Sequence, residues 1–278
     1  MTLYSDSPLV GIVVCTYNRP DSLEKALDVL SRQDYQNIQV VVVDDYSECS
    51  EKNKQVCESF SGKITYLRNQ KNMGISYTRN RGIEYLLNET DASLITMLDD
   101  DDWWPDYRLT KGVKVMKPGV GMSYGIQKMA DENLRTIHEY PCNTSYWKVR
   151  LRALLFGTFF FPAKTYMFNS DFLRELQLEN GNWYCDYICK EDIELGIRAL
   201  YHAHSKSEWR VEYIDNLLAK WVQKKGLKKF FTRSYQEKDW KYFLNMLNSY
   251  LSPPMSQLVA GLSPFTRSLP HSLRFGFI

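Results

Sequence analysis

The sequence predicts an α/β fold with a mostly parallel central sheet and flanking helices. Three observations support this prediction. Over the first third of the chain, continuous apolar stretches alternate with segments whose apolar residues recur at helical spacing. Each apolar stretch ends in polar residues, and the strand–helix–strand order repeats. Parallel strands joined by helices are buried on both faces, and such sheets bind ligands beyond the carboxyl ends of their strands.

Four stretches have the continuous apolar character of buried strands, namely residues 9–16, 38–43, 64–67 and 92–98. A helix is predicted to follow the first strand with Asp21 as its cap, because Glu24 stands three residues later as a capping-box partner. A second helix is predicted over residues 76–87, where apolar side chains recur at helical spacing.

The rest of the chain is mixed. Its pattern predicts short strands at residues 122–124, 136–140, 165–168 and 208–214, and helices at 147–156, from 170 onward and at 190–201. Beyond about residue 216, lysines and arginines alternate with large aromatic and aliphatic side chains. We expect a basic, aromatic and helical extension there, either lying on an anionic membrane surface or packing on the fold as a further helical layer or dimer contact.

Composition bounds the function. The chain has 278 residues and a formal net charge of +2, which gives little support to nucleic-acid binding. Its six cysteines form no CxxC pair, which is typical of free thiols in a reducing compartment. The N-terminal residues lack the features of a signal peptide, and no apolar stretch is long enough to span a bilayer. We therefore expect a cytoplasmic protein, either free or peripheral at the inner face of the membrane.

The most informative stretch is a run of four aspartates, Asp99–Asp102, at the end of the fourth predicted strand. Clustered carboxylates repel one another, and a divalent cation is their usual partner, although acidic runs are also often plain solvated loops. Residues 16–19 and the pair Asp44–Asp45 follow two other predicted strands. A parallel sheet brings all three clusters to one edge, which favours a ligand site over a solvated loop.

Four motifs in this region resemble those of the family 2 glycosyltransferases. In chain order they are VVCTYNRP at 13–20, VVVDDYS at 41–47, NMGISYTRNRG at 72–82 and the aspartate run. They cover roughly residues 8–110 in the family's order. Further along, CKEDIEL at 189–195 resembles the family's ED motif, which is a shorter match.

The resemblance implies the GT-A fold over residues 1–215, with a nucleotide-sugar half at 1–110, an acceptor half at 111–215 and the extension at 216–278. It implies a nucleoside-diphosphate sugar donor such as a UDP-sugar, a divalent metal (Mn²⁺ or Mg²⁺) and inversion at the anomeric carbon. It also implies a glycan or lipid-linked acceptor in bacterial surface-polysaccharide, O-antigen or capsule biosynthesis. Membrane contact through residues 220–250 and a homodimer are further expectations.

Site roles follow from the matched positions. Thr16, Tyr17 and Asp45 match the positions that hold the nucleotide base, and Asp99 and Asp101 match the ends of the DxD motif, with Asp101 as the metal ligand. Asp192 matches the catalytic base and Glu191 its neighbour in the ED motif. The matched motifs complete the expected donor-contacting set with Asn18, Arg19, Gly74, Arg79 and Asp100.

Plainer roles stand beside these. Asp44 and Asp45 are also typical helix-capping residues, and Glu191 and Asp192 are typical first-turn acids. Arg79 is equally consistent with a surface ion pair. The aromatic residues Trp103, Trp104, Trp183 and Tyr184 fit either a sugar-stacking platform or the core, and we expect His202 and His204 to be structural or exposed.

Two other functions would use parts of the same pattern. A non-catalytic sugar-nucleotide-binding subunit would keep Asp45 and the aspartate run but tolerate loss of the base, and the intact Glu191–Asp192 pair argues against it. A nucleotidyltransferase on a related fold would normally carry a glycine-rich phosphate loop after the first strand, where this chain has none.

Overall fold

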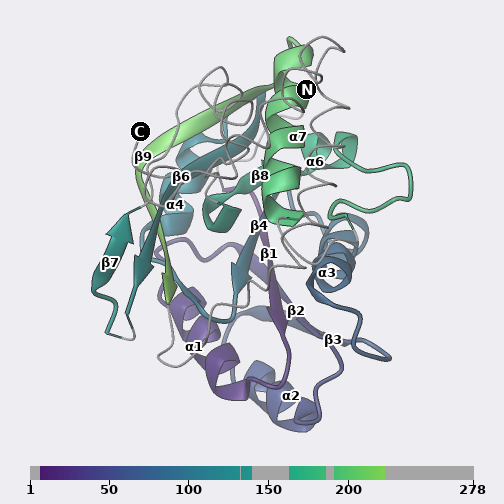
Figure 1. Ribbon diagram of the computed structural model, residues 1–278, viewed down its shortest axis with the longest axis vertical. Helices are drawn as coiled ribbons and strands as arrows, with labels where there is room; N and C mark the ends of the chain where they lie inside the picture. Colours follow the sequence, from purple (N-terminus) through teal and green to yellow (C-terminus); the bar gives the residue numbers. More distant parts are fainter. Residues whose placement is uncertain (1–6, 132, 140–162, 186–190, 223–278) are drawn as a thin grey trace, which may run out of the picture. The chain divides into compact units, whose positions relative to one another are not determined.

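The computed structural model describes residues 7–131, 133–139, 163–185 and 191–222 (Figure 1). The chain divides into two compact units, one made of Met1–Tyr140 with Pro162–Lys225 and the other of Pro141–Phe161 with Gly226–Ile278. The described residues all belong to the first unit. The predicted helix at 147–156 and most of the predicted C-terminal extension lie outside the described residues.

Four parallel strands form one half of the sheet, in the order β3 (Lys63–Arg68), β2 (Ile38–Asp44), β1 (Val10–Thr16) and β4 (Leu94–Asp99). All four predicted strands are thereby confirmed. β1 and β2 are buried along almost their whole length, as their β-branched sequences require of central parallel strands. The register aligns Thr16 with Asp44 and Cys15 with Asp99, so the polar strand ends lie at one edge.

Three helices connect these strands, namely α1 (Pro20–Ser31), α2 (Ser50–Glu58) and α3 (Ile75–Glu89). The predicted cap at Asp21 was wrong: α1 begins at Pro20, its N-cap is Arg19, two residues before Asp21, and no side chain caps it. Proline at the first helical position is favourable because its missing N–H would have no partner there. α2 was not predicted, since it buries only Asn53 and Cys57 and so lacks an apolar stripe.

The second half of the sheet is mixed in direction. Its elements are β5 (Asp102–Trp103), α4 (Arg108–Val115), β6 (Val120–Ala130), β7 (Thr136–Glu139), the 3-10 turn η1 (Ala163–Thr165), β8 (Met167–Asn169), α6 (Ser170–Glu175), α7 (Glu191–Ser205) and β9 (Arg210–Val222). The strand order continues β4-β8-β6-β9-β5, with β7 paired to β6. β8 is antiparallel to both β4 and β6, whereas β6 and β9 run parallel.

β9 continues beyond the position where the sequence predicts a helical extension. The predicted boundary stood at residue 216, but the strand runs on to Val222 and pairs there with Ala130 of β6. The start of the extension as predicted is therefore wrong. Among the helices of the described residues, none is long and apolar enough to cross a membrane.

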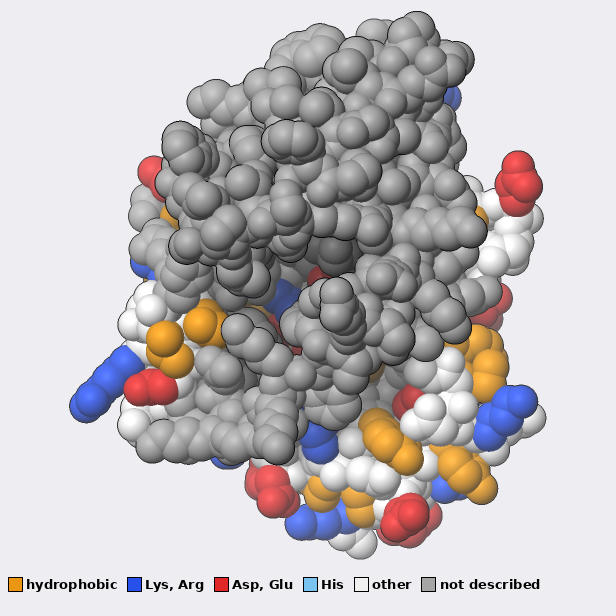
Figure 2. Space-filling view, in the orientation of Figure 1, with side chains coloured by type: hydrophobic (Ala, Val, Ile, Leu, Met, Phe, Trp, Pro, Cys, Tyr) orange, Lys and Arg blue, Asp and Glu red, His pale blue; other side chains and the backbone are white. Residues whose placement is uncertain are grey.

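The core lies between the parallel strands and α1 and continues under α4. Its fully buried side chains include Val10, Ile12, Val14, Leu23, Leu30, Val40, Val42, Leu94, Leu98, Trp104 and Leu109. On the described part of the face in Figure 2, hydrophobic side chains stand among charged ones. Burial of this core fixes β1, β2 and β4, and with them the edge that carries the polar clusters.

Candidate active site

The loops after β1 and β2 are bound to each other. Asn18 adopts a positive φ of 54°, a conformation that asparagine tolerates better than most residues. Its backbone N–H donates to Ser47 Oγ at 2.8 Å, and its side-chain Oδ1 accepts from the Glu48 N–H at 2.8 Å. Asn18, a predicted donor-binding residue, therefore links the loop after β1 to the loop after β2 through these two hydrogen bonds.

Asp45, predicted to read the nucleotide base, anchors the loop that leads into α3. Its Oδ1 accepts from Asn69 Nδ2 and from the Met73 N–H, both at 2.8 Å, and its Oδ2 accepts from the Gly74 N–H at 2.9 Å. Gly74 has φ +84°, which suits glycine. A carboxylate offers about four acceptor positions, so three internal bonds leave Asp45 able to accept one more.

Asp44 has a structural role. It is fully buried, and its oxygens accept from the Ser47 N–H, from Asn53 Nδ2 and from the Tyr66 hydroxyl, each at 2.7 Å. The helix-capping alternative was wrong for Asp44, because Cys49 is the N-cap of α2 and no side chain caps that helix. Asp44 instead holds the turn that precedes α2.

Asp99 lies between two cations. Arg79 NH2 donates to both Asp99 oxygens at 2.9 Å, and the Lys164 ammonium contacts Asp99 Oδ2. Burial opposes the charged form of Asp99, but Arg79 and Lys164 outweigh it and hold its pKa well below the usual range. Asp99 is therefore a permanently charged centre of the site.

Asp100 points inward, toward β1. Thr16 Oγ1 donates to its Oδ2 at 3.1 Å, and Arg19 NH2 lies 2.9 Å from its Oδ1. Burial raises the pKa of Asp100 to about 7, repulsion from Asp101 and Asp99 adds to the effect, and Arg19 opposes it. Arg19 also lies 3.4 Å from Asp101, so the predicted residues Thr16, Arg19, Asp100 and Asp101 do meet.

Asp102 belongs to the site although it was absent from the predicted residues. Its Oδ2 lies 3.1 Å from the Lys164 ammonium, and its buried Oδ1 has no hydrogen-bond partner among the described residues. Burial raises the pKa of Asp102 to about 8, against the attraction of Lys164. A buried oxygen without a partner, beside two further carboxylates, is what a ligand of a cation presents.

The residues fit a divalent ion. One oxygen from each of Asp99, Asp101 and Asp102 lies within 4.8 Å of the others. Hard cations such as Mg²⁺ take oxygen ligands of this kind, and Asp101 is the more exposed of the set, with 28% of its side chain accessible. The predicted metal ligand Asp101 therefore lies in a group that can hold the ion.

The ED motif reaches the same place from the start of α7. Arg79 NH1 donates to Glu191 Oε1 at 2.6 Å, and Glu191 is buried, so Arg79 is a buried bridge and not a surface ion-pair residue. Burial, and then repulsion from Asp192, raises the pKa of Glu191 to about 6 against the attraction of Arg79. Arg79, Met97, Asp99, Lys164, Tyr184 and Asp192 line one small pocket.

Aromatic residues divide between core and site. Trp104 and Trp183 are buried, and the Arg108 guanidinium lies 4.8 Å from the Trp104 ring, so these tryptophans pack in the fold. Tyr184 is also buried, but it lines the pocket beneath Arg79. Tyr17, by contrast, is 44% exposed at the end of β1. His202 has a structural contact, 2.7 Å from Glu175 Oε2.

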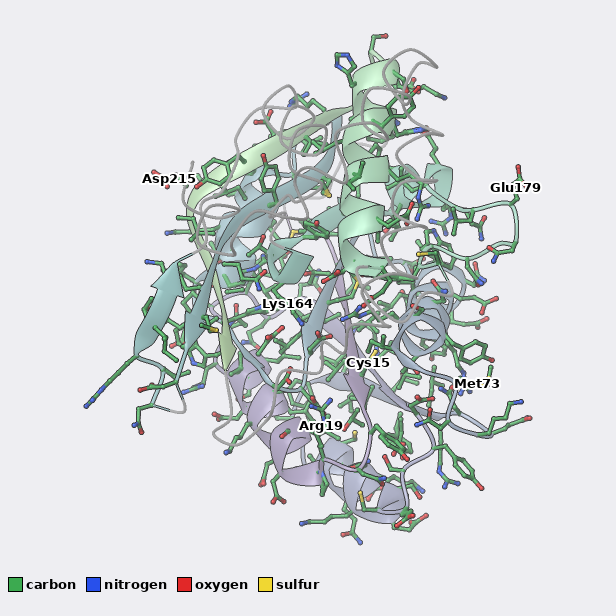
Figure 3. All side chains as sticks on the ribbon, viewed as in Figure 1. Cys15, Arg19, Met73, Lys164, Glu179 and Asp215 are labelled. Carbon is green, nitrogen blue, oxygen red and sulfur yellow. The ribbon has the colours of Figure 1, made fainter. Side chains whose placement is uncertain are left out.

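Lys164, like Asp102, is a site residue to which the sequence analysis gave no role. It lies in η1 and is labelled near the centre of Figure 3. No motif marks it, because it stands in a stretch of the chain without matched residues. Its only sequence signal is a lone basic residue within an apolar run.

Comparisons with known proteins agree with this arrangement. The family described as Glycosyl transferase family 2 matches residues 11–177. Among curated relatives, the putative colanic acid biosynthesis glycosyl transferase WcaA of Escherichia coli K12 is 35% identical over 106 residues, 38% of this chain and 37% of WcaA. The uncharacterized glycosyltransferase MJ1057 of Methanocaldococcus jannaschii is 22% identical over 86% of this chain and 83% of its own length.

Coverage of other relatives is smaller. Glycosyltransferase GlyA of Streptococcus pneumoniae is 30% identical over 50% of this chain, but the match spans only 20% of GlyA. The chain thus spans 37% of the length of WcaA and 20% of the length of GlyA.

Solved structures share the fold. S. aureus TarS 1-349, in complex with UDP-GlcNAc, superimposes with a TM-score of 0.67 at 16% identity, covering 95% of this chain and 75% of that one. The mannosyltransferase PcManGT of Pyrobaculum calidifontis, in complex with GDP-Man and Mn²⁺, gives 0.58 at 17% identity over 96% and 72% of the two chains. These likenesses establish the predicted GT-A fold, and the family match over more than half of the sequence shows that the chain belongs to the family 2 glycosyltransferases.

Proposed function

We propose that this protein is a metal-dependent, inverting glycosyltransferase that moves a sugar from a nucleoside-diphosphate sugar, a UDP-sugar in the first instance, to an acceptor hydroxyl. One observation carries the proposal: Arg79 binds the aspartate run and the ED motif at once, so donor-side and acceptor-side carboxylates share one pocket. A transferase needs this proximity, because the leaving diphosphate and the attacking hydroxyl react at the same anomeric carbon.

The donor base binds beside Asp45 in this proposal. The acceptor position that Asp45 retains would take an N–H of the base, and the exposed ring of Tyr17 would stack on it. Thr16, Asn18 and Gly74 act by fixing the shape of this cradle. The Thr16 carbonyl accepts from the Asp45 N–H, the Asn18 N–H donates to Ser47, and the Gly74 N–H donates to Asp45. Arg19 lies beside the aspartates, where it would face the phosphates.

A divalent ion would be held by Asp101, with oxygens of Asp99 and Asp102 close enough to share it. When bound, such an ion supplies Lewis-acid stabilisation of the charge that develops on the leaving diphosphate. Asp99 and Asp100 would then position the donor, Asp99 through its fixed charge and Asp100 through its contacts with Thr16 and Arg19.

Asp192 is the proposed base. It lines the pocket, whereas its neighbour Glu191 is committed to Arg79. Asp192 would accept the proton of the acceptor hydroxyl as that oxygen attacks the anomeric carbon and the bond to the diphosphate breaks. A single displacement of this kind inverts the configuration and needs no covalent intermediate. Glu191 contributes by orienting Arg79 and the first turn of α7.

The setting is proposed from relatives. WcaA is named for colanic acid biosynthesis, and AmsB of Erwinia amylovora, 30% identical over 110 residues, for amylovoran biosynthesis. We propose an acceptor that is a glycan or lipid-linked saccharide in surface-polysaccharide assembly at the inner face of the membrane. Contact with that membrane through residues 220–250, and a homodimer, remain part of this proposal.

A thermal-shift screen of nucleotide sugars with Mn²⁺ tests the donor class, because a ligand that binds the folded state raises its apparent stability. We expect one nucleotide family to shift the melting temperature in Mn²⁺ and not in EDTA. Proton NMR of the product made with that donor then tests inversion through the anomeric coupling. A product that retains the donor's configuration, or a screen in which no nucleotide sugar binds, would contradict the proposal.

A further inference from the structure

Lys164 lies between two carboxylates of the group that could hold a divalent ion. Its ammonium contacts Asp99 Oδ2 and lies 3.1 Å from Asp102 Oδ2, and both aspartates belong to the triad whose oxygens lie within 4.8 Å of one another. Among the described residues, no other cation is recorded in an ion pair with two members of that triad.

We propose that Lys164 is a resident counter-cation of the metal site, with which the divalent ion competes for Asp99 and Asp102. This inference rests on the proposed metal-dependent function. In the metal-free protein the ammonium holds the buried carboxylates together, and metal binding moves it off the oxygens that the ion then takes.

The charges require a cation of this kind. Four consecutive aspartates face only Arg19, Arg79 and Lys164 among the described residues, and Arg79 divides its guanidinium between Asp99 and Glu191. Arg19 is half exposed and reaches only Asp100 and Asp101. Asp102 is therefore left with Lys164 as its recorded ion-pair partner, and an unpaired charge at so buried a position would be costly.

The chain beside Lys164 is anchored by hydrogen bonds to three other segments. Thr165 Oγ1 accepts from the Gly125 N–H at 2.9 Å, and the Thr165 carbonyl accepts from Arg108 NH2 at 2.7 Å. The next carbonyl, that of Tyr166, accepts from Thr96 Oγ1 of β4 at 2.6 Å. A lysine on such an anchored segment has a flexible four-carbon stem, so its ammonium can leave the carboxylates without a change of fold.

The chemistry of the oxygens also points to exchange. Asp102 Oδ1 is buried and has no hydrogen-bond partner among the described residues, so Lys164 satisfies only one of its two oxygens. A divalent ion is smaller in contact distance and carries twice the charge, and it can draw on Asp101 as well. The ion should therefore displace the ammonium when its concentration is high enough.

Mn²⁺ titration of the donor-free protein, followed by the electron paramagnetic resonance signal of free Mn²⁺, tests the proposal directly. We expect Lys164→Met to bind Mn²⁺ at least about tenfold more tightly than the natural protein, since a competing positive charge is removed. Lys164→Arg keeps the charge and should stay near the natural affinity. Lys52→Met is the control: it removes a surface lysine whose ammonium lies 3.0 Å from Asp21 Oδ1, and it should leave the Mn²⁺ affinity unchanged.

Equal or weaker Mn²⁺ binding by folded Lys164→Met would overturn the inference while leaving the metal site itself in place. Absence of Mn²⁺ binding in every variant would overturn the inference together with the metal dependence of the proposed function.

Should Lys164→Met fail to fold, amine acetylation of the natural protein read by mass spectrometry gives the same decision. We expect Mn²⁺ to increase the labelling of Lys164 and to leave that of Lys52 unchanged. Labelling of Lys164 that does not respond to saturating Mn²⁺ would overturn the inference.

Discussion

Arg79 on α3 donates a hydrogen bond of 2.6 Å to Glu191 at the start of α7, 112 residues later in the chain. Its other terminal nitrogen binds both oxygens of Asp99. Burial disfavours the charged guanidinium, but Asp99 and Glu191 outweigh that cost and raise the pKa of Arg79 well above its usual value. One buried, permanently charged fork thus joins the two acidic motifs of the site.

Replacement of Arg79 should therefore cost both stability and activity. Arg79→Met leaves two buried carboxylates without their partner, and we expect a loss of about 3 kcal/mol in the free energy of unfolding. We also expect kcat/KM to fall by about 100-fold through misplacement of the two motifs. Urea denaturation and initial rates measure the two effects.

Arg79→Lys sharpens this test because lysine keeps the charge but cannot bind Asp99 and Glu191 as a planar fork. It should fold better than the methionine variant yet remain impaired in transfer. Arg32→Met removes a surface arginine that pairs with Asp28, and it serves as the control with unchanged rates. Full activity of Arg79→Lys would show that charge alone suffices.

The two acids of the ED motif should respond differently to loss of charge. Asp192→Asn removes the proposed base, so kcat should fall by about 10² to 10⁴-fold with donor affinity unchanged. Glu191→Gln leaves the base in place and weakens the hold on Arg79, so a smaller loss of kcat should accompany a loss of stability. Initial rates at saturating substrate give kcat, donor titrations give the donor affinity, and urea denaturation gives the stability of each variant.

Glu179→Gln is the matched control, because Glu179 is exposed on the loop after α6, far from the labelled site residues in Figure 3. Undiminished transfer by Asp192→Asn would show that another group takes the proton.

The stability of the metal-free protein should depend on the pH through Asp100. Burial raises its pKa in the folded protein to about 7, above the ordinary value of 3.8, so the folded state binds this proton more tightly than the unfolded state. The resulting stability is fully present below about pH 4 and is lost as the pH rises through about 7.

Asp100→Asn is neutral at every pH and should remove this dependence. We expect the natural protein in EDTA to lose on the order of 2 kcal/mol between pH 5 and pH 8 relative to the variant, measured by urea denaturation. Parallel pH profiles for the two proteins would mean that Asp100 is already ionised at pH 5.

Gly74 offers a test of the Asp45 cradle. Its φ of +84° is strained for any residue with a Cβ, even though the space around that Cβ is open. Gly74→Ala should cost about 1 kcal/mol of stability and weaken donor binding, because the N–H that binds Asp45 would shift. Isothermal titration with the nucleotide measures the binding.

Gly181 provides the comparison, since it has φ +82° on the loop between α6 and α7. Gly181→Ala should cost similar stability with donor binding unchanged. Equal losses of donor affinity in the two variants would indicate a general effect of stability and not a cradle at Asp45.

The strand ends were predictable because β1, β2 and β4 are short apolar runs that each stop at polar residues. The topology then places Thr16, Asp45 and Asp99 together without any knowledge of side-chain contacts. The ED motif could be placed on a helix because the apolar residues of α7 recur at helical spacing.

The contacts that give the site its charge balance could not be predicted. Lys164 reaches Asp99 across 65 residues, and no local pattern records such a pairing. The use of Asp45 as the acceptor for Met73 and Gly74 depends on the path of a loop, and sequence periodicity carries no signal for that path. The extension of β9 to Val222 likewise reflects tertiary packing overriding local preference. The start of α1 at Pro20, by contrast, follows the local preference of proline for the first helical position.

Metal-dependent donor binding at the aspartate run is the central claim, and calorimetric titration of UDP tests it most directly. In Mn²⁺ we expect UDP to bind the natural protein, and EDTA should abolish binding until excess Mn²⁺ is restored. Asp101→Ala should lose this response, whereas Asp171→Ala, which alters an exposed aspartate in the first turn of α6, should keep it. Binding of UDP with the same affinity in EDTA and in Mn²⁺ would contradict the account.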